Sequence, residues 1–327
     1  MKVLVTGSAG HLGEALAITL TQRGDEVVGV DIVASPYTTI VGSIVDRDLA
    51  RRAMSGVDVV MHAATLHKPH VATHSRQDFI DVNVTGSLNL LEEAAAAKVR
   101  AFIFTSTTSV FGDALTPADN APAAWITEDV TPIPKNIYGV TKAAAEDLCQ
   151  LFHRNQNLPI IVLRTSRFFP EDDDDQHQRA RFSGENLKAN EFLHRRVDIE
   201  DVVDAHLLAA EKAPALGFRR YIVSATTPFA ESDCAALQRD AAAVVSRYIP
   251  DSESVYAARG WRMSPMIGRV YVNARCRAEL GWRPRYDFRA IIARLRSGDD
   301  ISSPMARRIG VKGYHAAPFA DGPYPVE

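Results

Sequence analysis

The first 165 residues alternate between short apolar runs and longer segments with helical spacing. Runs rich in β-branched residues predict strands at Lys2–Thr6, Glu26–Asp31, Val57–Ala63, Ala101–Ser106 and Ile160–Arg164. Stretches rich in alanine and leucine lie between most of them and predict helices at Leu12–Arg23, Asp46–Met54, Asp78–Ala97 and Tyr138–Arg154. Apolar strands that alternate with amphipathic helices indicate parallel strands joined by right-handed crossovers. We therefore expect an α/β fold with a doubly wound parallel sheet and helices on both faces.

The alternation ends after Arg164, where residues 165–197 are polar and are expected to be irregular. A helix at Ile199–Lys212 and a strand at Arg220–Val223 then extend the sheet. Residues 225–300 are mixed, with a helix expected near Glu231–Tyr248. This organisation predicts a core of residues 1–165, to which 198–224 return, and a smaller C-terminal lobe made of 166–197 and 225–300. Residues 301–327, rich in glycine, proline and aromatics, are expected to form an irregular tail.

Composition and charge exclude several classes of protein. The net charge is −3 and the pI is about 6.4, so no basic field points to nucleic acid or to an anionic membrane. No run of about 18 apolar residues and no signal-peptide stretch occurs. Cys149, Cys234 and Cys276 are odd in number and have no metal-binding spacing. We expect a cytoplasmic protein with no metal and no nucleic-acid or membrane partner.

A glycine-rich turn, TGSAGHLG at residues 6–13, follows the first predicted strand. Gly7 permits a tight turn, Gly10 lets a diphosphate approach the backbone, and Gly13 allows the next helix to pack closely on the sheet. The N-terminus of that helix offers N–H groups and a positive dipole to phosphates. Because it lies at the first strand–helix junction, the turn predicts a dinucleotide site in a Rossmann-like sheet. A purely structural glycine turn is the alternative.

Asp31 ends the second predicted strand, at the distance expected of an acid that accepts hydrogen bonds from an adenosine ribose diol. Its carboxylate would repel a 2′-phosphate, and no arginine or lysine follows in residues 32–35. We therefore predict NAD rather than NADP as the cofactor. The alternative is a solvated aspartate at the end of a strand.

Tyr138 and Lys142, in YGVTK, lie four residues apart and so share one face of a predicted helix. A free tyrosine has a pKa of about 10, and a nearby ammonium favours its ionised form. Lowering that pKa by about three units requires about 4 kcal/mol of differential stabilisation. The pair predicts a tyrosine that removes an alcohol proton while hydride leaves. Alone, this spacing also fits an ordinary helix surface.

Hydroxyl side chains follow the strand that starts at Ala101, in FTSTTSVFG at residues 104–112. They are expected at the carboxyl edge of the sheet, where open α/β sheets bind ligands. In this order, the glycine turn, Asp31, the hydroxyl cluster and the Tyr138–Lys142 pair resemble the extended short-chain dehydrogenase/reductase family, the NAD-dependent epimerase/dehydratase group. The resemblance covers about residues 1–290.

This resemblance implies a catalytic set of Thr107, Tyr138 and Lys142. Thr107 would hydrogen-bond the reacting substrate oxygen, Tyr138 would be the acid/base, and Lys142 would hold the nicotinamide ribose. Asn83 would have a structural or water-relay role, whereas His62 fits a hydrogen-bonded strand-end histidine better than a catalyst. Ser43 stands where the family often has an aspartate facing adenine. By position, cofactor contacts are implied for Gly7, Gly10, His11, Leu12, Gly13, Asp31, Ile32, Ser43, Ile44, Ala63, Ala64, Asn83, Thr105, Tyr138, Lys142 and Thr165.

Residues near the expected substrate side narrow the reaction. Nucleotide-sugar 4,6-dehydratases follow their catalytic threonine with Asp-Glu, but Thr107 is followed by Thr108 and Ser109, which argues against that reaction. Nucleotide-sugar relatives usually carry an asparagine, a ligand of the substrate diphosphate, where this chain has Arg167. Arginine also binds phosphate, so a nucleotide sugar is disfavoured and not excluded. The resemblance thus implies substrate contacts from Thr107, Thr108, Arg167 and Arg179.

A second resemblance, to uronate dehydrogenases, rests on the spacing of Arg164, Pro170 and Glu171. In those enzymes a downstream arginine pairs with the substrate carboxylate, a role that Arg179 or Arg181 would take here. The acidic run at 171–175 lacks the spaced ligands and turn glycine of a calcium loop, so we expect a solvated, mobile loop and no metal. His67, Lys68 and His70 either line the pocket or lie in a solvated loop.

Three functions remain open at this point. The first is an NAD-dependent oxidoreductase acting on a secondary alcohol of a sugar or sugar-like substrate. The second is a nucleotide-sugar epimerase, similar to UDP-glucose 4-epimerase, that retains its NAD. The third is a non-catalytic NAD(P)-sensing protein, which the presence of the Tyr138–Lys142 pair disfavours. From the resemblance we also expect a homodimer formed through the helices Asp78–Ala97 and Tyr138–Arg154, with close packing at Ala143–Ala145.

Overall fold

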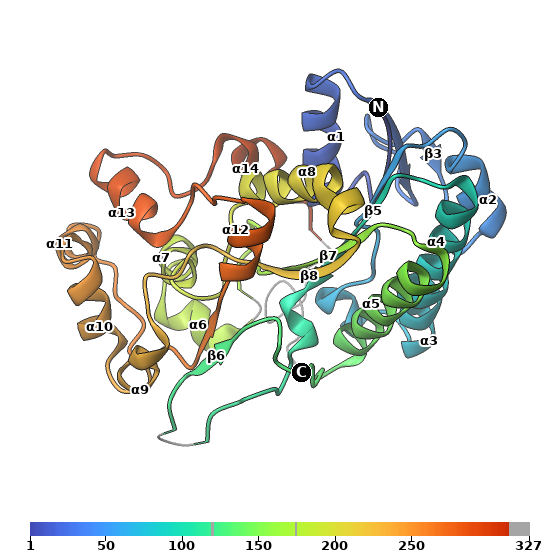
Figure 1. Ribbon diagram of the computed structural model, residues 1–327. Helices are drawn as coiled ribbons and strands as arrows, with labels where there is room; N and C mark the ends of the chain where they lie inside the picture. The colour runs from blue at the N-terminus through green and yellow to red at the C-terminus, as the bar shows by residue number, and fades with distance from the viewer. Residues whose placement is uncertain (119–120, 174, 314–327) are drawn as a thin grey trace.

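The computed structural model describes residues 1–118, 121–173 and 175–313 of the chain (Figure 1). At its centre lies a sheet of seven parallel strands in the order β3-β2-β1-β4-β5-β7-β8. The order runs outward in both directions from β1 and β4, as in a doubly wound sheet, so the predicted fold class is confirmed. The strands are β1 Lys2–Thr6, β2 Glu26–Asp31, β3 Ile40–Val41, β4 Val59–His62, β5 Ala101–Thr107, β7 Ile160–Thr165 and β8 Phe218–Val223.

Helices cover both faces of this sheet (Figure 1). On one face lie α1 (His11–Gln22), α8 (Ile199–Leu216) and α14 (Pro304–Ile309); on the other lie α2 (Arg47–Ala53), α4 (Gly86–Ala97) and α5 (Ile137–Gln156). Successive strand residues point to opposite faces, so Val3 and Val5 join one hydrophobic cluster and Leu4 joins the other. Burial on both faces explains why these strands are continuous apolar runs.

The helix expected at Asp78–Ala97 is interrupted. It begins as α3 (Arg76–Phe79), passes through a π-helical turn at Ile80–Thr85 and continues as α4. The wider turn contains Asn83, whose buried side chain bonds residues outside its own helix. Turns of this kind occur frequently at functional sites.

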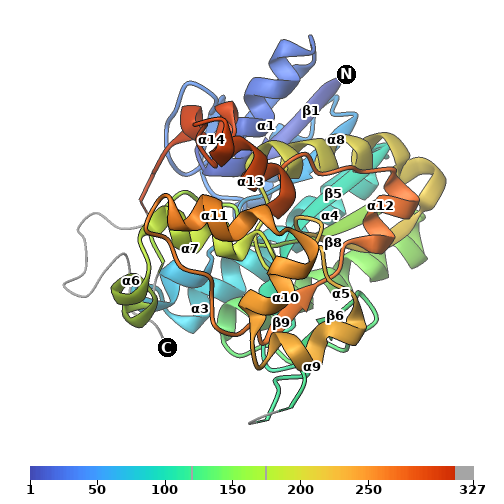
Figure 2. The same cartoon turned by 90° about the vertical axis from the view of Figure 1, so that its left-hand side faces the viewer.

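A third hydrophobic cluster forms the core of a smaller lobe, which faces the viewer in Figure 2. Its elements are α6 (Gln176–Arg181), α7 (Gly184–Glu191), α9 (Cys234–Leu237), α10 (Ala241–Tyr248), α11 (Asp251–Ala257) and α13 (Phe288–Arg296), with β6 (Ala124–Ile126) paired to β9 (Arg269–Tyr271). Another helix, α12 (Ala274–Leu280), packs on β8 and α8. The division into core and lobe at the predicted boundaries stays a prediction, which the separate hydrophobic cluster of the lobe supports.

Two expectations about this region are wrong. Residues 165–197 are not irregular throughout, because Asp175 and Ser183 cap the helices α6 and α7. The helix expected near Glu231–Tyr248 is broken into a 3₁₀ turn (Glu231–Asp233), α9 and α10. Asp240 accepts a hydrogen bond from the Ala243 N–H, which starts α10 afresh.

The expected irregular tail contains a helix. Ser303 caps α14, whose Ile309 is buried against the α1–α8 side of the sheet. Residues 314–327, the remainder of the predicted tail, lie outside the described residues. Within the described ranges no helix has both the length and the apolar character needed to cross a membrane.

Candidate cofactor and active site

A cavity of about 650 Å³ follows the carboxyl ends of β1, β2, β4, β5 and β7. This is the edge where the sequence placed the site, and most of the predicted cofactor residues line it. They are Gly7, Gly10, His11, Leu12, Gly13, Asp31, Ile32, Ser43, Ile44, Ala63, Ala64, Thr105, Tyr138 and Thr165. Four other predicted site residues are buried and are not among the described residues that line the cavity: Asn83, Thr107, Thr108 and Lys142.

The glycine turn fits a dinucleotide. Gly7 has φ = 74°, and a Cβ added there would lie 2.8 Å from the Ala64 nitrogen. A Cβ at Gly13 would lie 1.9 Å from the Gly7 carbonyl oxygen, so only glycine allows α1 to pack this close to the turn. Gly10 precedes α1 and makes no side-chain cap, which leaves N–H groups at the helix N-terminus for a phosphate.

Asp31 is held at the edge of the cavity by two backbone groups. Its carboxylate accepts hydrogen bonds from the Ala9 N–H at 3.0 Å and the Val33 N–H at 2.9 Å. The neighbouring Ile32 and Val33 line the same end of the cavity although they are 70% and 56% exposed. Apolar side chains beside a fixed carboxylate suit an adenosine, with a flat base on one side and a ribose diol on the other.

Tyr138 and Lys142 occupy consecutive turns on the buried face of α5. Asn136 caps this helix by accepting a hydrogen bond from the Gly139 N–H. Tyr138 lines the cavity beside Thr105 and Thr165, and its hydroxyl is hydrogen-bonded to Thr107. Lys142 is buried one turn deeper, with its Nζ 3.9 Å from the centroid of the Phe104 ring. The structure thus brings the three predicted catalytic residues together.

Burial dominates the electrostatics of this group. It raises the pKa of Tyr138 to about 12, and the hydrogen bond from Thr107 only partly offsets that increase. Burial also lowers the pKa of Lys142 to about 7, although the charge of Glu146 acts in the opposite direction. In the structure, desolvation therefore sets the direction of both pKa shifts, and the lowering of the Tyr138 pKa by Lys142 stays a prediction.

A buried ion network fixes the helix that carries Tyr138. Glu146, one turn beyond Lys142, accepts hydrogen bonds from the Ser106 hydroxyl at 2.6 Å and from Arg164 Nη2 at 2.8 Å. Arg220 reaches the same carboxylate from β8 at 3.1 Å. The network joins α5 to β5, β7 and β8, and so sets where Tyr138 lies relative to the edge of the sheet.

His62 and Asn83 have structural partners. His62 contacts the Thr6 hydroxyl through Nδ1 and the Ser87 hydroxyl through Nε2, and burial holds its pKa well below the usual value. The interpretation of His62 as a satisfied strand-end histidine is confirmed. Asn83 accepts a hydrogen bond from the Leu66 N–H and donates to Thr141, which ties the loop after β4 to α5.

The end of the cavity next to Tyr138 is lined by imidazole and aromatic rings. His67, His70 and His74 lie in sequence order along it, with ring centroids 4.7 and 5.2 Å apart. The His67 ring is 6.5 Å from Tyr138 and 5.4 Å from Phe169. Of the three residues that could line the pocket, His67 and His70 do so, and Lys68 is not among the described residues that line it. His74, Phe168 and Phe169 were missed, since no local pattern distinguishes them from solvated loop residues.

Arg167 and Arg179 take part in a different cluster. Arg167 forms an ion pair with Asp173 and lies 3.6 Å from Glu191, and Arg179 donates to the Asp173 carbonyl. Neither is among the described residues that line the cavity. Their assignment as substrate ligands stays a prediction.

The acidic run is only in part the solvated loop that the sequence suggested, since Asp172 is exposed but its neighbours are not. The Glu171 and Asp173 side chains are only 8% and 4% exposed, and Asp175 caps α6. Each of these acids is paired with a cation or with backbone N–H groups, so burial carries a smaller penalty. Asp174 lies outside the described residues. Among the described residues no group of three His, Cys, Asp or Glu side chains is placed to hold a metal ion.

Comparison with known proteins identifies the family. The model of the NAD dependent epimerase/dehydratase family matches residues 3–223, more than half of the chain. The chain belongs to this family. Family members depend on NAD, in agreement with the predicted cofactor and with the fit of the glycine turn.

Curated relatives of this chain have different activities. A UDP-glucose 4-epimerase of Erwinia amylovora is 32% identical over 184 residues, which cover 50% of this chain and 52% of that one. A 3-beta-hydroxysteroid dehydrogenase of Mycolicibacterium neoaurum is 25% identical over 332 residues and is matched over 87% of both chains. The chain spans about half the length of several of the curated relatives it matches.

Solved structures of other proteins show the same fold. A short-chain dehydrogenase/reductase superfamily protein from Agrobacterium tumefaciens with bound NAD superimposes with a TM-score of 0.66 at 23% identity, over 94% of this chain and 97% of that one. UDP-glucose 4-epimerase from Thermotoga maritima with UDP-glucose gives 0.60 at 20% identity, over 91% and 99%. At these identities the likeness concerns the fold alone.

Proposed function

We propose that this chain is an NAD-dependent dehydrogenase that oxidises a secondary alcohol of a sugar or sugar-like compound, with Tyr138 as the acid/base. The observation that carries the proposal is the placement of Tyr138 in the cavity wall, hydrogen-bonded to Thr107 and backed by Lys142. The glycine turn and Asp31 at the other end of the same cavity provide the dinucleotide site.

The proposed roles follow from these positions. NAD, when bound, supplies the hydride acceptor. Tyr138 takes the hydroxyl proton of the substrate as the carbonyl forms, and Thr107 holds the tyrosine oxygen in place by its hydrogen bond. Lys142, buried beneath Tyr138, would hold the nicotinamide ribose. Because burial lowers the pKa of Lys142 to about 7, both the charged and the neutral form of its amine are populated near neutral pH.

The substrate end of the cavity favours a compound without a diphosphate. Its walls are His67, His70, Phe168 and Phe169, and no arginine is found among the described residues that line the cavity. Arg167, at the position of the family's phosphate-binding asparagine, is instead engaged with Asp173 and Glu191. The dehydrogenase of Mycolicibacterium neoaurum, matched over most of both chains, also supports net oxidation of an alcohol.

The second candidate is a nucleotide-sugar epimerase, supported by the UDP-glucose 4-epimerase relatives. It would use Tyr138 in the same way but return the hydride to the substrate and keep its NAD. The third candidate is a non-catalytic NAD(P) sensor. The buried Tyr138 and Lys142 at the cavity disfavour it, because a sensor requires no acid/base pair. A screen of free sugars, sugar acids and nucleotide sugars, each with NAD and with NADP, separates these functions by whether NADH accumulates, an epimer forms, or neither occurs.

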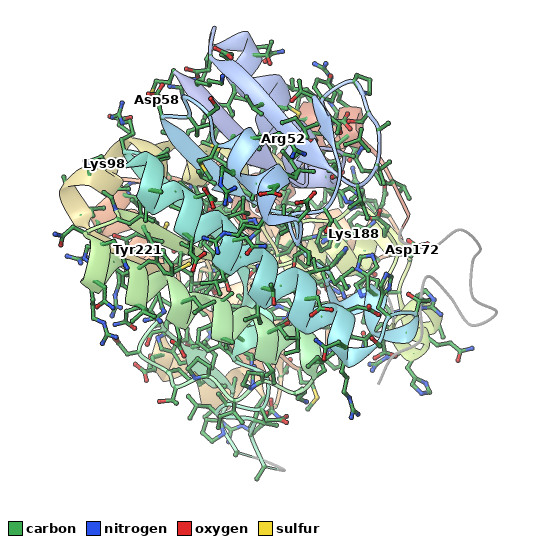
Figure 3. All side chains as sticks on the ribbon, turned by 90° about the vertical axis from the view of Figure 1, so that its right-hand side faces the viewer. Arg52, Asp58, Lys98, Asp172, Lys188 and Tyr221 are labelled. Atoms are coloured by element: carbon green, nitrogen blue, oxygen red, sulfur yellow. The ribbon has the colours of Figure 1, made fainter. Side chains whose placement is uncertain are left out.

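We also propose a homodimer formed by the outer face of α4 and α5, which faces the viewer in Figure 3. This face includes Val140 at 47% exposure and Leu151 at 37%. Of the three alanines expected to pack there, Ala145 is buried within the chain and Ala144 is exposed. A dimer predicts that Val140→Asp shifts the sedimentation coefficient to that of a monomer. A cytoplasmic location is proposed from the three free, buried thiols.

A further inference from the structure

Glu171, the first acid of the acidic run, contacts the glycine turn. Its Oε1 lies 2.7 Å from Nε2 of His11, the first residue of α1, and its side chain is only 8% exposed. Burial raises the pKa of Glu171, but the hydrogen bond and charge of His11 outweigh this effect and leave the pKa below its usual value. The carboxylate is therefore held in its ionised form beside the N-terminus of α1.

The same carboxylate binds the chain beyond α14. Glu171 Oε1 accepts hydrogen bonds from the backbone N–H groups of Lys312 at 3.1 Å and Gly313 at 3.4 Å. The Lys312 ammonium pairs with Glu14, in the first turn of α1. The segment is thus held by Glu171 on one side and by α1 on the other.

This segment is anchored to the body of the protein before it reaches the cavity. Ile309 is buried in the hydrophobic cluster on the α1–α8 side of the sheet. Asp198 accepts a hydrogen bond from the Ser303 N–H, and Glu200 accepts one from the Met305 N–H. With α14 fixed in this way, residues 310–313 have a short and defined path to Glu171.

Lys312 and Gly313 line the cavity together with Gly10 and His11. Among the described lining residues, Lys312 is the only lysine or arginine. Its ammonium therefore lies near the N-terminus of α1, where the helix N–H groups and the glycine turn are suited to a diphosphate. Glu14, the partner of Lys312 in the structure, carries one negative charge. A diphosphate carries more negative charge and therefore competes with Glu14 for the Lys312 ammonium.

We propose that Lys312 binds the diphosphate of the dinucleotide and that Glu171 is the positioning residue that holds residues 310–313 across the cavity. Lys312 thereby adds a side-chain contact to the backbone groups of the glycine turn. The proposal rests on dinucleotide binding at this cavity and is independent of which reaction the protein performs.

The test uses the full chain and measures binding rather than turnover. Titration calorimetry gives the Kd of NAD, ADP and adenosine for the wild type, Lys312→Gln and Glu171→Gln. Lys312→Gln should weaken NAD and ADP about tenfold and leave adenosine, which has no phosphate, unchanged. Lys312→Arg should restore most of the affinity. The weakening should diminish as salt is added, because the lost contact is between charges.

Glu171→Gln should weaken NAD in the same direction and speed NADH release in stopped-flow fluorescence, since the segment loses its anchor. The matched controls are Lys2→Gln and Glu26→Gln, which form an ion pair of 3.2 Å at the amino ends of β1 and β2, opposite to the cavity. Asp58, which accepts a hydrogen bond from the Lys2 N–H, is labelled in Figure 3 far from Asp172, the neighbour of Glu171. Both control variants should bind NAD as the wild type does.

An unchanged Kd for NAD and ADP in Lys312→Gln would overturn the proposal, as would an equal loss of affinity for adenosine. Lys312 is partly exposed, so this variant is expected to fold even if Glu171→Gln does not. If Lys312→Gln loses turnover but binds NAD with unchanged affinity, this inference fails and the proposed dehydrogenase function stands. If the wild type binds NAD more tightly than Lys312→Gln but oxidises no substrate, this inference stands and the proposed dehydrogenase function fails.

Discussion

Arg164 and Glu146 form a buried ion pair in which Arg164 Nη2 donates to Glu146 Oε2 across 2.8 Å, with side chains 4% and 2% exposed. The pair joins the end of β7 to the helix that carries Tyr138. Ser106 and Arg220 bind the same carboxylate, so Glu146 has partners on three strands. The position of Tyr138, the proposed acid/base, therefore depends on a residue that the sequence did not single out.

Removing this carboxylate should destabilise the protein strongly. Glu146→Ala leaves the buried Arg164 without its partner, which should lower the free energy of unfolding by about 3–5 kcal/mol. Asp147→Ala is the matched control, because Asp147 also pairs with Arg220 but is 81% exposed. Its effect should stay within about 0.5 kcal/mol in urea denaturation. Equal effects of the two substitutions would contradict the role given to Glu146.

The rate of alcohol oxidation should rise with pH. Tyr138 must be ionised to accept a proton, and burial raises its pKa to about 12, so the ionised fraction grows about tenfold per pH unit below that value. Reduction requires the protonated tyrosine and should be nearly independent of pH around neutrality. Measuring kcat/KM in both directions against pH checks the sign.

Thr107 provides a finer test of the same pH dependence. Its hydrogen bond lowers the pKa of Tyr138, so Thr107→Val should move the rise in oxidation rate to higher pH. Thr107→Ser keeps the hydroxyl and should keep the profile. A shift to lower pH in the valine variant, or no shift at all, would show that Thr107 does not act on Tyr138.

Asp31 should determine the preference for NAD over NADP. Asp31→Asn keeps the shape of the side chain but removes the charge that repels a 2′-phosphate. The ratio of kcat/KM for NAD to that for NADP should fall by about tenfold or more, corresponding to about 1.4 kcal/mol. If the ratio stays constant in steady-state kinetics, another residue discriminates between the cofactors.

Two glycines of the turn should respond differently to alanine. At Gly13 the added Cβ would lie 1.9 Å from the Gly7 oxygen, so Gly13→Ala should lower stability by about 1–3 kcal/mol. At Gly10 the nearest atom is 3.3 Å away and φ is −75°, so Gly10→Ala should fold normally and lose affinity for NAD. Thermal unfolding and NAD titration of both variants check this. The same result for both would contradict the separate roles.

The sequence was sufficient for the parts of the site whose residues are close together along the chain. Gly7 and Gly13 belong to the same short turn, Tyr138 and Lys142 are one helical turn apart, and Asp31 is the last residue of its strand. Each pattern has a local physical reason, and the structure places all but Lys142 on one cavity. Lys142 lies just behind Tyr138.

Long-range pairs could not be predicted in this way. Nothing near Glu171 in the sequence indicates that its partners are His11 and the Lys312 backbone, which lie on opposite ends of the chain. An uninterrupted acidic run normally repels itself into solvent, but here Asp173 is neutralised by Arg167 and packed inside. The burial of these charges depends on tertiary partners, and that is where local reasoning failed.

The most direct test of the proposed function measures how much NADH forms per protein molecule. With its sugar-like alcohol and excess NAD, the wild type should produce NADH in large molar excess over protein. The near-ultraviolet absorbance of NADH measures this formation. Tyr138→Phe should bind NAD normally and slow this formation about 100-fold or more. Retained NAD with an epimerised sugar and no NADH above the amount of protein would contradict the proposal that this family member is a dehydrogenase.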